Sequence, residues 1–197
     1  MALKVPQSKP AKAADAGALV DVWTLRLDVS PESVQAAGRY LAAGERERAA
    51  EFRNETARRN YVIAHAALRQ ILGRQLQVTP SEIQFSLGPH GKPALAGGVT
   101  GKLEFNLTHS GDLALVAVSR QAAVGIDVER VRPMPDAQRI AERFFSPDEA
   151  AQLKTMSEPA RAAAFLNLWT RKEAIAKATG VGIANSLARY TVTHGAE

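Results

Sequence analysis

The chain has 197 residues, of which 46% are hydrophobic and 23% charged, and it contains no cysteine. This balance excludes a wholly disordered chain, and the lack of cysteine excludes a disulfide scaffold, a thiolate zinc site and a cysteine nucleophile. The formal net charge of +5 favours anionic partners. No apolar run approaches the roughly 20 residues of a membrane helix, and residues 1–17 lack the apolar core of an export signal. We therefore expect a cytoplasmic protein that does not contact the membrane.

The first part of the chain predicts a tail, a strand and a helical region. Residues 1–18 are rich in Ala, Lys and Pro without periodicity, which indicates a flexible tail. Apolar and polar residues alternate over 23–29, as in a half-buried strand. Ser30 and Pro31 are typical of a helix start, and helical composition continues to about residue 76.

The middle is rich in predicted strands, and the last part is mainly helical. Alternating or continuous apolar runs predict strands at 83–87, 103–107, 113–118 and 124–128. Helices are then predicted from Asp136 to about Phe144, from Ser146 with a capping box, and from about Pro159 to Thr179, before a final strand near Tyr190 and Val192.

Strands and helices follow one another in the same order in both parts of the chain. This order predicts an α+β fold made of two similar α/β half-domains related by a pseudo-two-fold axis. We place the flexible tail at 1–18 and the half-domains at 19–111 and 112–197.

Two carboxylates at the end of the predicted strand 124–128 are candidate metal ligands. Asp127 and Glu129 are two positions apart, so they project from one face, about 7 Å apart along the strand. Hard oxygen ligands of this kind suit Mg²⁺. An Asp-x-Glu pair also arises by chance on solvent-facing strands, so it has weight only together with other motifs.

Glu173 and Lys177 form a second motif in the predicted helix 159–179. They are four residues apart and therefore lie on one face. Such a pair is commonly a surface ion pair. However, the helix around it is largely apolar, which indicates that the helix packs closely and that the two charges lie at the contact.

Two turns complete the set of motifs. His109 follows a predicted strand among small hydroxyl residues such as Thr108, a setting that suits a phosphate or a plain hydrogen-bonded turn. The turn at 90–93 is by itself unremarkable in composition, and it lacks the spacing of a P-loop.

Taken in order, the four motifs resemble those of the 4′-phosphopantetheinyl transferases of the Sfp type. They read His-Gly-Lys-Pro at 90–93, Phe-Asn-x-Thr-His-Ser-Gly at 105–111, Gly-Ile-Asp-Val-Glu at 125–129 and Trp-x-x-Lys-Glu-Ala-x-x-Lys-Ala-x-Gly at 169–180. The resemblance covers roughly residues 20 to 193. It implies transfer of the phosphopantetheine arm of coenzyme A to a serine of an apo carrier protein, with release of adenosine 3′,5′-bisphosphate.

The resemblance also implies the site residues. Asp127, Glu129 and Glu173 would bind Mg²⁺, with Mn²⁺ as the open alternative, and Glu173 would accept the serine proton. The catalytic set would be Glu173, Lys177, His109 and Asp127. The coenzyme A contacts would come from Arg46, Arg48, His90, Gly91, Lys92, Pro93, Thr108, His109, Lys172 and Lys177.

The sequence departs from the family pattern in three places. Thr108 stands where serine is more usual, which preserves the hydroxyl group. Glu45 and Arg48 replace a pair of lysines, so one basic position is retained. The C-terminus is shorter than is typical, so either the sequence is a cut form of a longer chain or this member has a reduced C-terminal sheet.

Three functional hypotheses remain. The favoured one is an active, Mg²⁺-dependent transferase that modifies acyl, peptidyl or aryl carrier proteins. The second is a non-catalytic module of the same fold that binds coenzyme A or carrier proteins. The third is a nucleic-acid binder, which would rest on the arginines between 39 and 74 but lacks a recognition motif. Because the motifs come from both halves of one chain, we expect a monomer.

Overall fold

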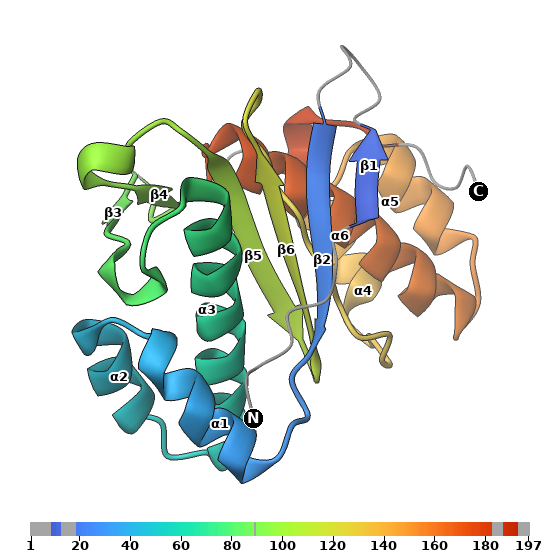
Figure 1. Cartoon of the computed structure of the whole chain (residues 1–197). Helices are drawn as coiled ribbons and strands as arrows, with labels where there is room; N and C mark the ends of the chain where they lie inside the picture. Colours follow the sequence, from blue (N-terminus) through green and yellow to red (C-terminus); the bar gives the residue numbers. More distant parts are fainter. Residues whose placement is uncertain (1–8, 13–18, 89, 183–186, 193–197) are drawn as a thin grey trace.

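A computed structural model describes residues 9–12, 19–88, 90–182 and 187–192, to which all structural statements refer. Its main sheet has four antiparallel strands in the order β1-β2-β6-β5, and a separate hairpin pairs β3 with β4. The strands are β1 (Lys9–Lys12), β2 (Leu19–Arg26), β3 (Phe85–Leu87), β4 (Pro93–Leu95), β5 (Glu104–Ser110) and β6 (Leu113–Ser119). Figure 1 shows this sheet at the centre of the molecule.

The described helices follow the predicted signals closely. They are α1 (Pro31–Ala37), α2 (Ala43–Ala50), α3 (Glu55–Leu76), α4 (Ala137–Phe144), α5 (Pro147–Lys154) and α6 (Ala160–Thr179), with 3₁₀ turns η1 (Gly38–Tyr40), η2 (Pro80–Glu82), η3 (Gly97–Val99) and η4 (Leu187–Arg189). Ser30 caps α1, and Ser146 forms the predicted capping box with Glu149. Gly180, with φ of +69°, ends α6. None of these helices is long and apolar enough to cross a membrane.

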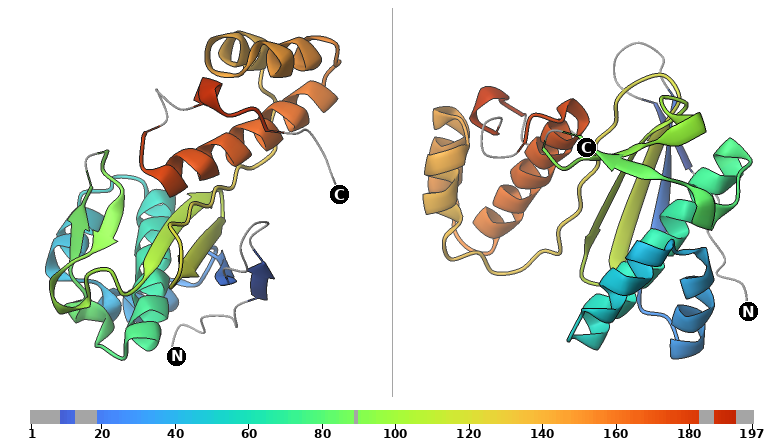
Figure 2. Two further views of the ribbon diagram at one scale, coloured as in Figure 1. Left: turned by 90° about the horizontal axis from the view of Figure 1, so that it is seen from above. Right: turned by 90° about the vertical axis from the view of Figure 1, so that its left-hand side faces the viewer.

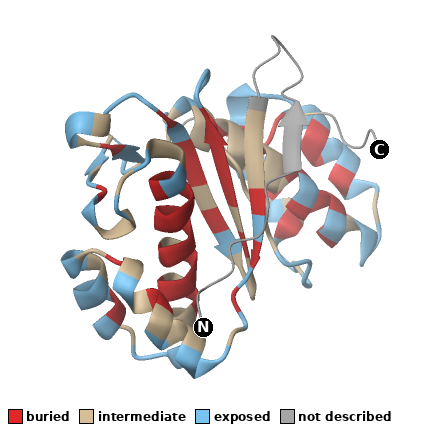
Figure 3. Ribbon diagram, in the orientation of Figure 1, coloured by how far each residue is buried: buried red, intermediate tan, exposed pale blue. Residues whose placement is uncertain are grey.

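The two faces of the sheet differ in chemistry. Trp23, Val116 and Phe105 belong to one apolar core together with the buried residues of α3, which covers this face (Figures 1 and 3). Because side chains alternate along a strand, the opposite face of β5 carries Asn106 and Thr108, which are polar and buried. One face of β5 therefore packs on α3, and the polar residues of its other face point toward residues 126 and 127.

The three C-terminal helices have an apolar core of their own. Phe145 stacks on Phe165 with ring centroids 5.3 Å apart, and Leu153 and Leu168 are fully buried beside them. Figure 2 shows this group of helices beside the sheet, with the end of α6 nearest to it. The molecule thus has two apolar cores with a seam between them.

An extended segment, residues 123–130, runs through this seam. The predicted strand at 124–128 does not form: the structure assigns these residues to neither helix nor strand. On one side, the amide of Ile126 donates to Asn106 Oδ1 of β5 at 2.9 Å. On the other side, Gly125 lies against α6 so closely that a Cβ would be 1.9 Å from the Ala174 carbonyl oxygen. The segment is held by side chains and by close packing instead of a strand ladder.

The α+β class is confirmed, and the pseudo-two-fold relation of the two halves stays a prediction. After β6, no strand occurs in residues 120–182 and 187–192, so the final strand near Tyr190 and Val192 is wrong for the described residues. The boundary at 111/112 stays a prediction; it falls in the turn of the β5–β6 hairpin, whose strands pair along their whole length. Of the tail at 1–18, Lys9–Lys12 pairs with β2, and the remainder lies outside the described residues.

We predict that Gly125→Ala lowers the melting temperature by at least about 5 °C, because the added Cβ would overlap backbone atoms of α6 that cannot move independently. Thermal unfolding followed by circular dichroism would measure this. Gly44→Ala in α2 is the control, since a Cβ there meets nothing within 4 Å and alanine favours a helix. Equal melting temperatures for the two variants would contradict the close approach.

Candidate active site

Three charged side chains meet where α6 faces the extended segment and β5. The Lys177 ammonium donates to Asp127 Oδ1 at 2.5 Å and lies 3.4 Å from Glu173 Oε2. Thr108 of β5 donates to the same Asp127 oxygen at 2.9 Å. Asp127, Glu173 and Lys177, three of the four predicted catalytic residues, are thereby brought together.

Both carboxylates of this group are largely buried. The side chain of Asp127 is 4% exposed, and its Oδ2 is buried without a hydrogen-bond partner. Burial raises the pKa of Glu173, and the negative charge of Asp127 raises it further, although Lys177 opposes both effects. A carboxylate with a raised pKa beside a second one is typical of a functional site.

Glu129 points to the same side as Asp127 but has other partners. Ser110 of β5 donates to Glu129 Oε2 at 2.9 Å, and Arg132 donates to the same oxygen at 3.0 Å. Within the described part of the chain, no group of three or more Asp, Glu, His or Cys side chains is placed to hold a metal ion. The three-carboxylate metal site stays a prediction; Ser110 and Arg132 both bond to Oε2 of Glu129.

The remaining donor set fits a hard divalent cation in part. Asp127 and Glu173 both contact one ammonium group, so both can contact one cation, and the unpartnered Asp127 Oδ2 is an acceptor suited to a metal. Carboxylate oxygens without sulfur or imidazole favour Mg²⁺ or Mn²⁺ over softer metals. Two ligands would leave the other positions of such an ion to water and phosphate.

His109 lies at the edge of a cavity between α3 and the β5–β6 turn. The cavity has a volume of about 530 Å³, and Phe52, Tyr61 and Arg130 also line it. Burial lowers the pKa of His109, and the positive charges of His65 and Lys177 lower it further. An imidazole ring together with aromatic side chains suits the base of a nucleotide.

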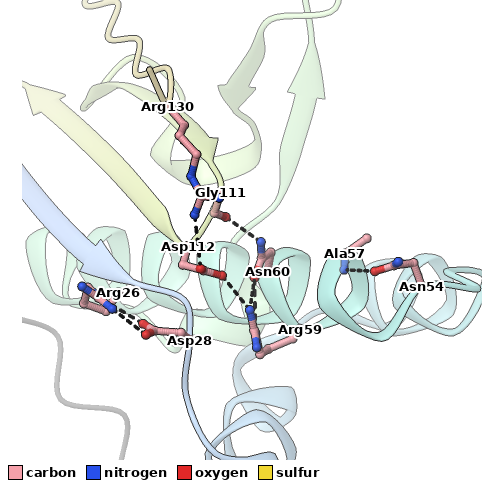
Figure 4. A network of polar contacts seen from close by, with 9 residues as sticks. All are labelled: Arg26, Asp28, Asn54, Ala57, Arg59, Asn60, Gly111, Asp112 and Arg130. Carbon is pink, nitrogen blue, oxygen red and sulfur yellow. Dashed lines mark hydrogen bonds and ion pairs between the residues drawn. The ribbon is translucent and has the colours of Figure 1, made fainter. Parts of the chain in front are cut away.

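A polar network joins this cavity to the extended segment (Figure 4). Asp112, in the turn between β5 and β6, accepts from Arg59 of α3 at 2.8 Å and lies 3.5 Å from Arg130. Asn60 donates to the carbonyl of Gly111 at 2.7 Å. Arg130 of the segment and the first turns of α3 therefore contact the same β5–β6 turn.

Among the remaining predicted coenzyme A residues, the turn at 90–93 contacts α6. Lys92 donates to the carbonyls of Val124 and Ala178 at 3.1 and 3.3 Å, where the helix ends and its dipole favours a cation. A Cβ on Gly182 would lie 3.6 Å from the ring of His90. Gly91 takes a positive φ of +77° within the turn. The turn and the end of α6 therefore form one contact.

Lys172 is placed where it cannot contact a ligand. Its side chain is fully buried, pairs with Glu149 at 2.8 Å and donates to the carbonyls of Leu187 and Tyr190. The predicted contact between Lys172 and coenzyme A is therefore corrected to a structural ion pair. It ties the segment after α6 to α5, with Glu149 also accepting from the amide of Val192.

Arg46 and Arg48 lie on different surfaces of α2. Arg48 is exposed, pairs with Glu51 at 2.6 Å and lies over the ring of Phe52, which lines the cavity of His109. Arg46 lines a separate cavity and donates to the carbonyl of Leu41. Only Arg48 is therefore beside the other candidate residues.

Glu45, one of the departures from the family pattern, has a structural role. It accepts from Arg69 at 2.5 Å and contacts His65 at 3.3 Å. Burial raises the pKa of Glu45, but bonds from His65 and Arg69 outweigh burial and hold it below its usual value. Arg69 in turn donates to the carbonyls of Pro80 and Ile83, which joins α2 and α3 to the following loop.

Sequence reasoning did not single out Asn106, Ser110 or Asp112. The first two lie in the Phe-Asn-x-Thr-His-Ser-Gly motif at every second position with Thr108, so strand alternation could have identified them. Asp112 gave no signal, since its partners come from α3 and the extended segment.

Comparisons with known proteins show the family of the chain. A family model described as the 4′-phosphopantetheinyl transferase superfamily matches residues 123–196, and one described as 4′-phosphopantetheinyl transferase, N-terminal, matches residues 28–121. The two matches meet at the start of the extended segment. The 4′-phosphopantetheinyl transferase HetI of Nostoc sp. is 38% identical over 166 residues, which cover 84% of this chain and 70% of HetI. The chain belongs to the 4′-phosphopantetheinyl transferase superfamily.

Two further relatives show the same similarity. A protein of Synechocystis sp. is 36% identical over 147 residues, which cover 75% of this chain and 60% of the relative. The 4′-phosphopantetheinyl transferase Sfp of Bacillus subtilis is 29% identical over 153 residues, which cover 78% of this chain and 66% of Sfp. The chain thus spans about two thirds of the length of these relatives.

The raised pKa of Glu173 predicts how its removal changes stability with pH. A carboxyl whose pKa is raised by folding destabilises the fold at pH values above its unfolded pKa, where ionisation is favoured more in the unfolded chain. Glu173→Gln should therefore raise the melting temperature at pH 7.5, and the gain should vanish near pH 4.

Differential scanning calorimetry across this pH range is the measurement. Glu47→Gln, at an exposed position of α2, is the control and should change the melting temperature at neither pH. A lower melting temperature of the Glu173 variant at pH 7.5 would contradict the predicted cost of its charge.

Proposed function

We propose that the protein transfers the 4′-phosphopantetheine arm of coenzyme A to a serine of an apo carrier protein. The observation that carries this proposal is the meeting of Asp127, Glu173 and Lys177 at the contact of α6, the extended segment and β5. Membership of the superfamily supports it, since HetI and Sfp bear the name of this activity. The basic surface of the N-terminal helices suits an acidic carrier protein.

The proposed reaction exchanges one bond to phosphorus for another. The serine oxygen forms a bond to the phosphorus that carries the pantetheine arm, and the bond from this phosphorus to the bridging oxygen breaks. Its electron pair leaves with adenosine 3′,5′-bisphosphate. Glu173 accepts the serine proton, for which its raised pKa is favourable, because a base is most effective with a pKa nearer the working pH.

The other charged residues act on the phosphates. Lys177 is proposed to stabilise the negative charge that develops on the pyrophosphate, since its ammonium is half-buried and held in place by Asp127. Mg²⁺, when bound, would neutralise phosphate charge. Asp127 and Glu173 would hold it, with Glu129 as a third ligand through Oε1, since Ser110 and Arg132 both bond to Oε2.

The proposed binding site for the nucleotide end of coenzyme A is the cavity of His109. Its aromatic side chains and the nearby Arg48 suit an adenine ring and a phosphate. The turn at 90–93 lies at the end of α6 close to the charged cluster, which supports a coenzyme A contact by His90, Gly91 or Pro93. The carrier class, the monomeric state and the cytoplasmic location remain predictions.

We expect an apo carrier protein incubated with this chain, coenzyme A and Mg²⁺ to gain the mass of one phosphopantetheine arm, and to gain none with EDTA. Intact-mass spectrometry measures both. Glu173→Gln should fold and transfer about 10² to 10⁴-fold more slowly, the usual contribution of a general base. Glu47→Gln is the matched control and should retain the full rate.

Two outcomes would overturn the proposal. A near-normal rate for Glu173→Gln would remove this residue from the mechanism. Binding of coenzyme A without transfer to acyl, peptidyl and aryl carriers would favour the non-catalytic module of the same fold.

A further inference from the structure

One face of β5 contacts the extended segment three times in succession. Asn106, Thr108 and Ser110 are two residues apart and therefore project from the same face. Asn106 Oδ1 accepts from the amide of Ile126 at 2.9 Å, and Thr108 donates to Asp127 at 2.9 Å. The third side chain, Ser110, makes two contacts.

Ser110 fixes both the side chain and the backbone of the segment. Its hydroxyl donates to Glu129 Oε2 at 2.9 Å and accepts from the amide of Arg130 at 3.1 Å. A hydroxyl has one donor and two acceptor positions, so both bonds form at once. The contacts advance along β5 and along the segment in the same direction, so the segment runs parallel to the strand.

These bonds take the place of a strand ladder. Among the backbone hydrogen bonds of the described residues, none joins 124–130 to a strand, and this segment is in neither helix nor sheet. Side chains of β5, which lie outside the segment, therefore set the orientation of Asp127 and Glu129. Asn106 fixes the backbone just before Asp127, and Ser110 fixes it just after Glu129.

We propose that Asn106 and Ser110 are positioning residues that hold Asp127 and Glu129 in place for a divalent cation and the pyrophosphate of the substrate. The inference rests on the proposed function and adds to it residues that touch neither substrate nor metal. Removal of a partner that orients a metal-binding carboxylate typically lowers metal affinity or activity 10- to 100-fold.

The alternative is that these bonds only stabilise the seam. Ser110 separates the two possibilities, because threonine keeps the hydroxyl whereas alanine removes both bonds. Ser110 is only partly buried, so the exchange to alanine leaves the apolar cores unchanged. Glu104→Gln, at an exposed position on the same face of β5, is the control.

The experiment measures Mn²⁺ affinity by electron paramagnetic resonance for the full chain with coenzyme A present, together with kcat and KM for transfer. For Ser110→Ala we expect an approximately 10-fold weaker Mn²⁺ affinity and a similar fall in kcat, with little change in KM for coenzyme A. Ser110→Thr should restore both, and Glu104→Gln should change neither. Asn106→Ala should show the same pattern as Ser110→Ala.

The outcomes distinguish this inference from the proposed function. If the unmodified chain transfers the arm and Ser110→Ala melts lower but keeps its Mn²⁺ affinity and kcat, the residue is only structural and the inference is wrong. If the unmodified chain itself neither binds Mn²⁺ nor transfers the arm, it is the proposed function that fails. Where Ser110→Ala does not fold, Asn106→Ala, which removes the bond to the amide of Ile126, decides by Mn²⁺ affinity and kcat in the same way.

Discussion

The contact of Gly125 with α6 is the constraint on which the candidate site depends. No side chain larger than hydrogen fits between the backbone of this residue and the carbonyl of Ala174. The extended segment can therefore lie directly on the helix, with its other side against β5. Asp127, two residues further on, then reaches Lys177, which lies one turn of α6 beyond Glu173. A glycine thus sets the distance between elements that belong to two different cores.

The site occupies the seam because the seam is where polar groups can be buried and still bonded. Both cores are apolar, one between the sheet and α3 and the other among α4, α5 and α6. Between them, β5 offers amide and hydroxyl groups, α6 offers Glu173 and Lys177, and the segment offers Asp127. Burial of two carboxylates around one ammonium is costly, as the raised pKa of Glu173 shows. Carboxylates with shifted pKa values are frequent at binding and catalytic sites.

Local signals in the sequence predicted the helices well. Ser30 with Pro31, and Ser146 with Glu149, cap helices as expected, and Gly180 ends α6, because these interactions depend on neighbouring residues alone. Strand pairing depends on distant partners. The apolar alternation at 124–128 therefore predicted a strand. Instead, the segment packs on α6 and bonds to side chains of β5.

Among the charged residues of the site, too, local spacing was predictive and contacts between distant residues were not. The spacing of Glu173 and Lys177 fixed their common face, and the structure brings them to Asp127. Lys172 belongs to the same motif and was expected at coenzyme A. It directly precedes Glu173, however, and adjacent residues of a helix point in different directions. The side chain of Lys172 therefore lies in the other core, where it pairs with Glu149. The periodicity of the helix could have separated these two lysines, since Lys172 faces the apolar side. Asp112 could not have been found in this way, because its partners come from two other parts of the chain, α3 and the extended segment.

Amide hydrogen exchange of the extended segment, followed by nuclear magnetic resonance, tests the central claim most directly. The account predicts slow exchange at Ile126 and Arg130, whose amides bond to Asn106 and Ser110, and fast exchange at Val128, for which the described residues provide no hydrogen bond. Slow exchange at Val128 equal to that at Ile126 would show a paired strand and contradict a segment held by side chains. Fast exchange at all three amides would show that β5 does not hold the segment in solution.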